Sequence, residues 1–326
     1  MEQAPLMPGV EAPIVQELNI EAIEPGTVAR LWLQVISDGL GQPVCIPVIV
    51  VRGARPGRTL GLTAALHGNE LNGIPIIQRL FRQLDPLRLS GTILGVPVLN
   101  TPSFLRQERF YLDGRDLNHL MPGRSDGTAS EVYAHGVFSS IVGQMDYLVD
   151  LHTASSGRVN SFYIRADMDK AETREMALLH NPQIIVHNPP SDGTLRGAAT
   201  AQGVHAITLE LGDPQVFQKT IISAGLTGIQ NLMIHLGMMD GTIMPATRPP
   251  VLCQKSYWLY AEEGGILTVR PNLGDMLEKG QRVATVRNVF GDLVKTYEAP
   301  EDGIVIGKSV NPVNYSGGRI LHLGIV

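Results

Sequence analysis

The sequence is poor in cysteine and in charged side chains. Its 326 residues include two cysteines, Cys45 and Cys253, which lie far apart in apolar, strand-like stretches. A disulfide framework is therefore excluded by count, and buried free thiols are expected. Charged residues make up 17% of the chain, and the formal net charge is −5. Because no run of basic residues is present, the sequence argues against nucleic acid as a partner.

Long apolar runs are also absent. No stretch approaches the roughly 18 apolar residues that cross a bilayer, which argues against a membrane partner. The N-terminal stretch MEQAPLMPGVEAPIVQEL is acidic and interrupted by prolines. It lacks the basic region followed by an apolar region that marks a secretion signal. We therefore expect a cytoplasmic protein.

Apolar residues and turn formers are abundant. Hydrophobic residues make up 44% of the chain, which also contains 35 glycines and 22 prolines. Such a chain can bury a large core, and its many turns indicate many strands. Its length corresponds to one large domain or to two.

The first part of the chain alternates between strand and helix patterns. Short apolar stretches that end in turns predict buried strands at residues 59–66, 91–100, 146–153 and 205–212. Apolar residues at helical spacing predict helices at residues 73–84, 131–145 and 217–239. This order predicts an α/β fold, in which a largely parallel sheet carries helices on its faces.

The pattern changes near residue 250. From about residue 251 the helical period disappears, and short strands alternate with glycine turns. We therefore expect an α/β domain at residues 1–248 and a small all-β domain at residues 249–326. The stretch at residues 247–250 is the expected linker between them.

Residues 101–130 show no clear period and are expected to form a long loop. Loops of this length inside a compact domain are usually functional. An arginine there could stabilise an oxyanion or hold a substrate carboxylate with two hydrogen bonds. For any single arginine, a solvated, charge-paired loop is an equally good explanation, and the same holds for Arg196. The polar residues of this loop include Arg106, Arg109, Arg115, Asp116, Asn118 and Arg124.

Four further polar residues lie at or near the ends of predicted strands. His67 and Glu70 follow the strand at 59–66, His152 ends YLVDLH, and Glu210 lies near the end of HAITLELG. In open α/β sheets, ligands bind at the carboxyl ends of the strands, so these side chains should share one edge. His67, Glu70 and His152 would supply two imidazoles and a carboxylate to zinc, with a fourth position open for water.

The remaining residues of this group suit a hydrolytic site. Glu210 would act as a general base that takes a proton from water and passes it to a leaving amine. Asp150 could orient His152 from behind. Each residue also has an ordinary explanation, because a lone His-x-x-Glu is more often a surface turn and a strand-end histidine is usually hydrogen-bonded structurally. The ordinary explanations, however, require three separate coincidences at strand ends. A carboxylate in the strand TLELG is also unusual, because carboxylates are rarely buried without a partner.

The motifs HGNELNG, DGRDLNHLMPG, DLHT and TLELG, in this order and spacing, resemble the succinylglutamate desuccinylase and aspartoacylase family of the zinc carboxypeptidase-like superfamily. The resemblance covers essentially the whole chain. It implies a three-layer α/β/α arrangement with a mixed sheet and one zinc ion per chain. It also implies that His67, Glu70 and His152 bind the zinc and that Glu210 is the base. Arg109 resembles the arginine that polarises the scissile carbonyl, and Asn118 resembles half of an Asn–Arg pair for a substrate carboxylate.

The loop departs from the family at one position. The family pattern is DLNR, whereas this chain has DLNH, with His119 in place of the arginine. Histidine cannot reproduce the bidentate fork of arginine. Either another arginine (Arg115, Arg124 or Arg196) takes the carboxylate, or the substrate lacks one there. The site residues expected to contact substrate are therefore Asn118, His119, Arg115 and Arg196.

The C-terminal region resembles the small β domain of such deacylases and also lipoyl or biotinyl carrier domains, which have a barrel-sandwich form. A carrier needs a lysine at an exposed hairpin tip, and the central hairpin VRNVFGDLV has none there. A lid or partner surface is therefore the favoured interpretation. Such a lid would narrow the cleft and favour small substrates.

Together these observations predict a zinc-dependent amidohydrolase that removes an acyl group from a small N-acyl amino acid or related amide. One alternative is a metallocarboxypeptidase that acts on short peptides. Another is a non-catalytic metabolite-binding protein on a degenerate hydrolase scaffold, to which only His119 points. The sequence does not determine the oligomeric state, and it allows a homo-oligomer.

Overall fold

The computed structural model describes residues 12–190 and 193–326. Residues 1–11, which begin the N-terminal stretch considered above for targeting, lie outside the described residues. Within the described part of the chain, no helix is long and apolar enough to span a membrane. Cys45 and Cys253 are both buried and free, as expected.

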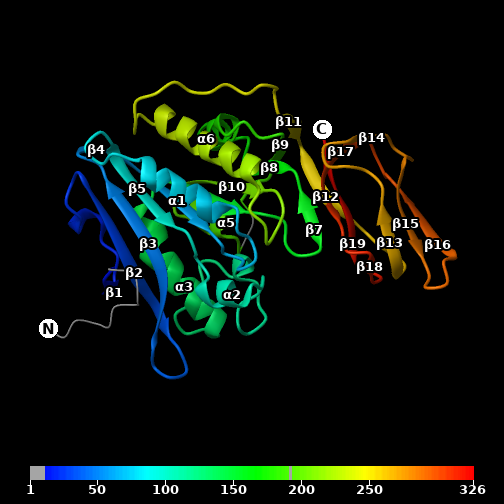
Figure 1. Cartoon of the computed structure of the whole chain (residues 1–326), viewed down its shortest axis with the longest axis horizontal. Coiled ribbons are helices and arrows are strands. Elements are labelled where there is room, and N and C mark those ends of the chain that lie inside the picture. Colours follow the sequence, from blue (N-terminus) through cyan, green and yellow to red (C-terminus); the bar gives the residue numbers. More distant parts are fainter. Residues whose placement is uncertain (1–11, 191–192) are drawn as a thin grey trace.

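A large mixed sheet forms the centre of the molecule (Figure 1). In the described residues it has ten strands in the order β1-β2-β3-β5-β4-β6-β10-β8-β9-β11. Six of the nine neighbouring pairs are parallel; β2/β3, β3/β5 and β10/β8 are antiparallel. The strands are β1 Ile14–Val15, β2 Thr27–Ser37, β3 Pro43–Arg52, β4 Arg55–Ala64, β5 Ser90–Val96, β6 Tyr147–His152, β8 Phe162–Ala166, β9 Ile184–His187, β10 His205–Leu211 and β11 Val251–Cys253.

The central strands β6 and β10 are apolar and buried along almost their whole length, and β4 is apolar and buried over its last five residues, 60–64. Strands that are covered on both faces show such continuous apolar runs. β6 lies between β4 and β10 and runs parallel to both, so that all three end at the same edge of the sheet. The predicted strands at 59–66, 146–153 and 205–212 are confirmed, and so is their shared edge.

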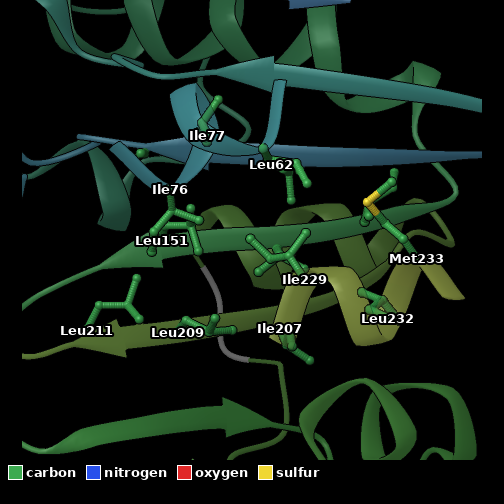
Figure 2. Packing of buried hydrophobic residues seen from close by; sticks show 14 of the residues in the cluster. Leu62, Ile76, Ile77, Leu151, Ile207, Leu209, Leu211, Ile229, Leu232 and Met233 are labelled. Carbon is green, nitrogen blue, oxygen red and sulfur yellow. The ribbon is translucent and has the colours of Figure 1, made fainter. Parts of the chain in front are cut away.

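Helices cover both faces of the sheet. α1 (Gly73–Gln83), α4 (Ala171–Leu179) and α6 (Lys219–His235) pack on one face. α3 (Ala129–Ile141) and α5 (Leu195–Ala201) pack on the other. Figure 2 shows the first of these cores, where Ile76 of α1 and Ile229 of α6 meet the strand residues Leu62, Leu151 and Ile207. The expected three-layer α/β/α arrangement is confirmed.

One expectation for the segment at 101–130 is wrong. Residues Thr101–Arg106 form a short helix, α2, whose first turn is capped by the Asn100 side chain, which accepts a hydrogen bond from the Ser103 N–H. A 3-10 helix at Leu117–His119 is capped in the same way by Asp116. Both are too short for a periodic pattern to reveal. Short 3-10 helices also occur at Ile20–Ala22 and Val142–Gln144.

Beyond β11 the chain forms two antiparallel sheets with a separate apolar core. In Figure 1 these strands gather at one end of the molecule. One sheet contains β12 (Lys255–Tyr260), β19 (Arg319–Ile325), β17 (Gly303–Ser309) and β14 (Met276–Leu277), and the other contains β16 (Leu293–Glu298), β15 (Arg282–Arg287), β13 (Gly265–Val269) and β18 (Val313–Asn314). β11 itself pairs with β9 in the large sheet, and β7 (Arg158–Asn160) pairs with β17. The domain boundary at 248/249 stays a prediction.

Candidate metal centre

The turn after β4 brings His67 and Glu70 to the edge of the sheet. The Glu70 N–H donates to the His67 carbonyl at 3.1 Å, which closes the turn. Gly68 lies between them against the backbone of α2, and a Cβ at this position would come within 2.1 Å of the Ser103 carbonyl carbon. Glycine is therefore required in HGNE because two backbone segments touch there.

Three buried side chains converge at this edge. Glu70 Oε1 lies 2.9 Å from His67 Nδ1, and Glu70 Oε2 lies 3.0 Å from His152 Nδ1. One ligand atom from each residue lies within 4.8 Å of the others, and all three residues are buried. The structure therefore places His67, Glu70 and His152 together, as a group that could hold a metal ion.

A second carboxylate lies behind each imidazole. His67 Nε2 is 3.0 Å from Asp116 Oδ1, and His152 Nε2 is 2.7 Å from Asp150 Oδ2. Asp150 in turn accepts a hydrogen bond from Thr63 Oγ1 at 2.7 Å. These contacts put the Nε2–H of each ring toward a carboxylate and leave Nδ1 facing Glu70. Asp150 therefore contacts His152 as expected, and its orienting role stays a prediction.

The charges of this cluster support one another. Burial would raise the pKa of Glu70, but the adjacent His67 and His152 outweigh it and hold that pKa well below its usual range. Burial would likewise lower the pKa of His152, whereas Asp150 and Glu70 raise it well above its usual value. The pKa of Asp116 is lowered against the effect of burial by His67 and Arg109. Ionised carboxylates thus surround both imidazoles.

The donor set fits a divalent metal. Two imidazole nitrogens and one carboxylate are a usual set of protein ligands for a catalytic zinc ion. In such sites the second nitrogen of each imidazole commonly contacts a carboxylate, as it does here. Such a set leaves a coordination position for water or substrate.

Glu210 and Arg109 reach the same cavity. The cavity has a volume of about 300 Å³, near the lower end of the range for small-molecule sites. Glu210 stands opposite His152 in the register of β10 and β6, and it accepts a hydrogen bond from Asn160 Nδ2 at 3.2 Å. Arg109 Nη1 donates to Ser155 Oγ at 2.6 Å and to Glu70 Oε1 at 3.1 Å.

Three of the four expected substrate contacts line this cavity, namely Asn118, His119 and Arg196. The Asn118 side-chain oxygen accepts a hydrogen bond from the Leu195 N–H, which ties the loop to the start of α5. His119 is 69% exposed. Arg196 is buried, and burial lowers its pKa to about 10, so that it remains a cation at neutral pH.

Arg115 does not reach the cavity. Its guanidinium donates to Thr128 Oγ1 at 2.8 Å and lies 3.4 Å from Glu131 Oε1, at the start of α3. Its two partners, Thr128 and Glu131, form the capping box of that helix. Arg124 likewise pairs with Asp126 on the surface. Of the three arginines considered as carboxylate partners, the structure therefore leaves Arg196.

Sequence reasoning missed several lining residues. Asp116 contacts His67, and Ser155 contacts Arg109. Only the folded chain shows these contacts, because no motif spacing links the residues. The same holds for the residues that follow DLHT and for those from the C-terminal strands. The missed lining residues include Ser155, Arg158, Asn160, Tyr163, Arg165, Asn188, Trp258 and Arg319.

The chain belongs to the succinylglutamate desuccinylase/aspartoacylase family, because the model of that family's catalytic domain matches residues 56–236. The resemblance stated from the motifs is confirmed. The N-alpha-acetyl-L-2,4-diaminobutyric acid deacetylase of Halomonas elongata is 29% identical over 280 residues, which cover 81% of each chain. The succinylglutamate desuccinylase of Pseudomonas paraeruginosa is 30% identical over 180 residues, which cover 51% of this chain and 54% of that protein.

Solved structures show the same fold over nearly the whole chain. The product-bound ectoine utilization protein EutE (DoeB) of Ruegeria pomeroyi superposes with a TM-score of 0.84 at 24% identity, over 94% of this chain and 98% of that one. A succinylglutamate desuccinylase from a Silicibacter species gives a TM-score of 0.82 at 25% identity, over 94% and 97%. The similarity therefore includes the C-terminal strands as well as the catalytic domain.

Proposed function

We propose that this protein is a zinc-dependent hydrolase that removes the acyl group from a small N-acyl amino acid. The observation that carries this proposal is the buried group of His67, Glu70 and His152, which lies at the same cavity as Glu210 and Arg109. The relatives named above, a deacetylase and a desuccinylase of N-acylated amino acids, support the substrate class.

His67, Glu70 and His152 would hold one zinc ion per chain. When bound, zinc lowers the pKa of a coordinated water and polarises a carbonyl group. Asp116 and Asp150 would fix the direction of the two imidazoles, since each contacts the Nε2 side of its ring and leaves Nδ1 toward the metal position.

Glu210 would serve as the general base. It lies at the end of β10, opposite His152, and one of its oxygens is held by the Asn160 amide. In the proposed reaction, Glu210 takes a proton from the attacking water and returns it to the nitrogen of the leaving amine as the acyl C–N bond breaks. The products are a carboxylic acid and a free amino acid.

Arg109 and the loop around Asn118 would bind the substrate. Arg109 is anchored by Asp116, with 2.8 Å between Nη2 and Oδ2, and a donor fixed in this way can stabilise charge that develops on the acyl oxygen. Arg196 is a buried cation that donates to Asn188 and forms no direct ion pair among the described residues, so it is suited to a substrate carboxylate. Asn118 and His119 would complete this side of the cavity.

The carboxypeptidase alternative is less well supported. Trp258 of β12 and Arg319 of β19 line the cavity together with the metal cluster. These strands therefore narrow the approach to the cluster, which suits a small molecule better than a polypeptide. The non-catalytic alternative conflicts with a complete ligand set and a base at one cavity.

A hydrolysis screen tests the proposal. The zinc-loaded protein is incubated with N-acetyl and N-succinyl amino acids, and release of free amine is measured. We expect one zinc per chain, turnover of part of the panel, and a loss of kcat of at least about 100-fold in Glu210→Gln with zinc retained. Glu172→Gln, an exposed carboxylate on α4, is the matched control. Absence of hydrolysis across the panel would overturn the function, and full turnover by Glu210→Gln would remove Glu210 from its role.

A further inference from the structure

Positive charge accumulates around the cavity. Among the described residues, the lining contains five arginines but only two carboxylates, Glu70 and Glu210. Arginine keeps its charge in proteins, so this excess cannot be removed by loss of protons. The five arginines are Arg109, Arg158, Arg165, Arg196 and Arg319.

Two of these arginines are compensated within the protein. Arg109 lies 3.1 Å from Glu70 and 2.8 Å from Asp116. Arg165 Nε lies 3.5 Å from Glu210 Oε1, and its Nη2 donates to the Tyr163 hydroxyl at 2.7 Å. The charges of Arg109 and Arg165 are therefore balanced by carboxylates of the proposed metal centre and by the proposed base.

Arg158 and Arg319 are different. In the described part of the chain, neither forms an ion pair with a carboxylate; what they share is the indole ring of Trp258. The guanidinium carbon of Arg158 is 5.9 Å from the ring centroid, and that of Arg319 is 5.3 Å from it. Such cation–π contacts orient a guanidinium but do not neutralise it.

This cluster spans two parts of the chain. Arg158 belongs to β7, which follows the metal ligand His152 and pairs with β17 of the C-terminal sheet through Arg158 and Ser309. Trp258 and Arg319 come from β12 and β19 of that sheet. In Figure 1, β7 lies between the large sheet and the C-terminal strands, beside β12 and β19.

The indole ring of Trp258 is held in place by contacts within the protein. The His322 ring stacks on Trp258 with centroids 5.1 Å apart and an angle of 12° between the planes. His322 is buried, and its Nε2 lies 2.9 Å from Ser256 Oγ. Burial, together with the charges of Arg165 and Arg319, holds the pKa of His322 well below its usual value, so that the ring stays neutral. A neutral, stacked ring fixes Trp258 without adding to the positive charge.

We propose that Arg158 and Arg319, positioned by Trp258, form a carboxylate-binding subsite that is separate from Arg196 and determines substrate specificity. Two unpaired guanidiniums beside one cavity repel each other, and a carboxylate that accepts hydrogen bonds from them would relieve that repulsion. This inference rests on the proposed function and narrows it to N-acyl amino acids that carry at least two carboxylates. A substrate with a cationic side chain would be disfavoured, because it would meet further positive charge. Arg158 and Arg319 would thereby replace the arginine of the DLNR motif, at whose position this chain has His119.

Binding measurements on the zinc-loaded protein test the subsite without catalysis. Calorimetry compares L-glutamate with L-glutamine, and succinate with succinamate, so that each dicarboxylate is matched by its own monoamide. The first pair examines the amine half of the substrate, and the second examines the acyl half. We expect at least one dicarboxylate to bind about 10-fold or more tightly than its monoamide, as a charged hydrogen bond predicts. Equal binding within both pairs would overturn the proposal.

Variants identify the residues responsible. Arg158→Gln and Arg319→Gln should each reduce the preference for the dicarboxylate, and the double variant should abolish it. Arg282→Gln, an exposed arginine of β15 outside the cavity, is the matched control and should keep the preference. Thermal unfolding of each variant verifies that it folds. A double variant that is folded and keeps the full preference would overturn the assignment.

Kinetics separate this inference from the proposed function. N-acetyl-L-glutamate is compared with N-acetyl-L-glutamine and with N-α-acetyl-L-2,4-diaminobutyrate. In Arg158→Gln and Arg319→Gln we expect KM for N-acetyl-L-glutamate to rise by about 10-fold or more, with kcat little changed. KM for N-acetyl-L-glutamine, which has one carboxylate, should change less. Equally efficient hydrolysis of all three by the wild-type protein would overturn the subsite and leave the hydrolase intact. A binding preference without hydrolysis of any substrate would retain the subsite and overturn the hydrolase.

Discussion

At the residue scale, we expect Asp150 to affect the proposed metal centre without binding the metal. Its carboxylate holds His152 Nε2 at 2.7 Å and is itself held by Thr63. Asp150→Asn keeps the shape of the side chain but removes the charge that fixes the ring. We expect zinc affinity to fall by about 10- to 100-fold, since loss of such outer partners has effects of this size. Competition with a chromogenic chelator measures it.

The control for this change lies on the same segment. Asp146 precedes β6 and accepts a hydrogen bond from the Thr59 N–H, away from the metal cluster. Asp146→Asn should therefore leave zinc affinity unchanged. If Asp150→Asn bound zinc as tightly as the wild-type protein, the orienting role would be wrong.

Among single residues, the sequence predicted best those whose side chains can bind metal or transfer protons and which also lie at the end of a predicted strand. His67, Glu70, His152 and Glu210 are polar side chains at the ends of apolar strands, so their meeting could be predicted from strand ends alone. Asp116 could not be placed in this way. It comes 49 residues after His67 in the chain and reaches it only because the 3-10 turn after it folds back. Such contacts depend on tertiary structure, which no local pattern records.

At the scale of elements, long periodic segments were predicted well and short ones were not. The strands at the centre of the sheet and α1, α3 and α6 follow clear patterns, and their observed bounds lie close to the expected ones. α2, with six residues, has too few turns to show a period. Arg115 was expected at the cavity because nothing in the local sequence pairs it with Thr128 and Glu131 at the start of α3, a contact that only the folded chain shows.

The packing of α1 on β4 and β6 gives a prediction at this scale. Gly73 begins α1, and a Cβ there would come within 2.7 Å of the Cβ atoms of both Ala64 and Leu151. Gly73→Ala should therefore destabilise the fold by about 1–3 kcal/mol, because overpacking outweighs the better helix propensity of alanine. It should also weaken zinc binding, because Leu151 precedes His152. Chemical denaturation and zinc competition measure the two effects.

Gly143 provides the comparison for Gly73. It lies in the 3-10 helix Val142–Gln144, and nothing comes within 4 Å of a Cβ built there. Gly143→Ala should leave stability within about 0.5 kcal/mol or raise it slightly, since alanine restricts the unfolded chain. Similar losses in both variants would mean that the close approach of α1 to the sheet is not the cause.

At the scale of the whole molecule, the C-terminal strands complete the cavity. The sequence indicated an all-β region and favoured a lid over a carrier, but it could not say which of its residues reach the site. Trp258 and Arg319 do so because β7 pairs with β17 and draws that sheet against the residues that follow His152. Pairing between segments almost 150 residues apart leaves no periodic signal, and so this part of the site was not predictable.

This junction can be tested through Gly307 of β17. A Cβ at Gly307 would lie 2.3 Å from Asn160 Oδ1 and 3.0 Å from the Val159 carbonyl oxygen, so Gly307→Ala must move the Asn160 side chain. The Asn160 amide donates to Glu210, so a displaced Asn160 would release the proposed base from its position. We expect kcat to fall with zinc content unchanged, because the proposed metal ligands belong to β6 and to the turn after β4. Steady-state kinetics and metal analysis measure the two quantities.

A double-mutant cycle with Asn160→Ala decides whether the effect passes through that side chain. If Gly307→Ala acts by moving Asn160, the double variant should have the same kcat as Asn160→Ala alone, because the hydrogen bond to Glu210 can be lost only once. Additive losses would mean that the C-terminal sheet acts on the cavity by another route, such as displacement of Arg158 or Trp258. In that case KM for a dicarboxylate substrate should rise as well, which loss of the Asn160 hydrogen bond alone does not predict. The cycle therefore separates the influence of the C-terminal strands on the base from their influence on substrate binding.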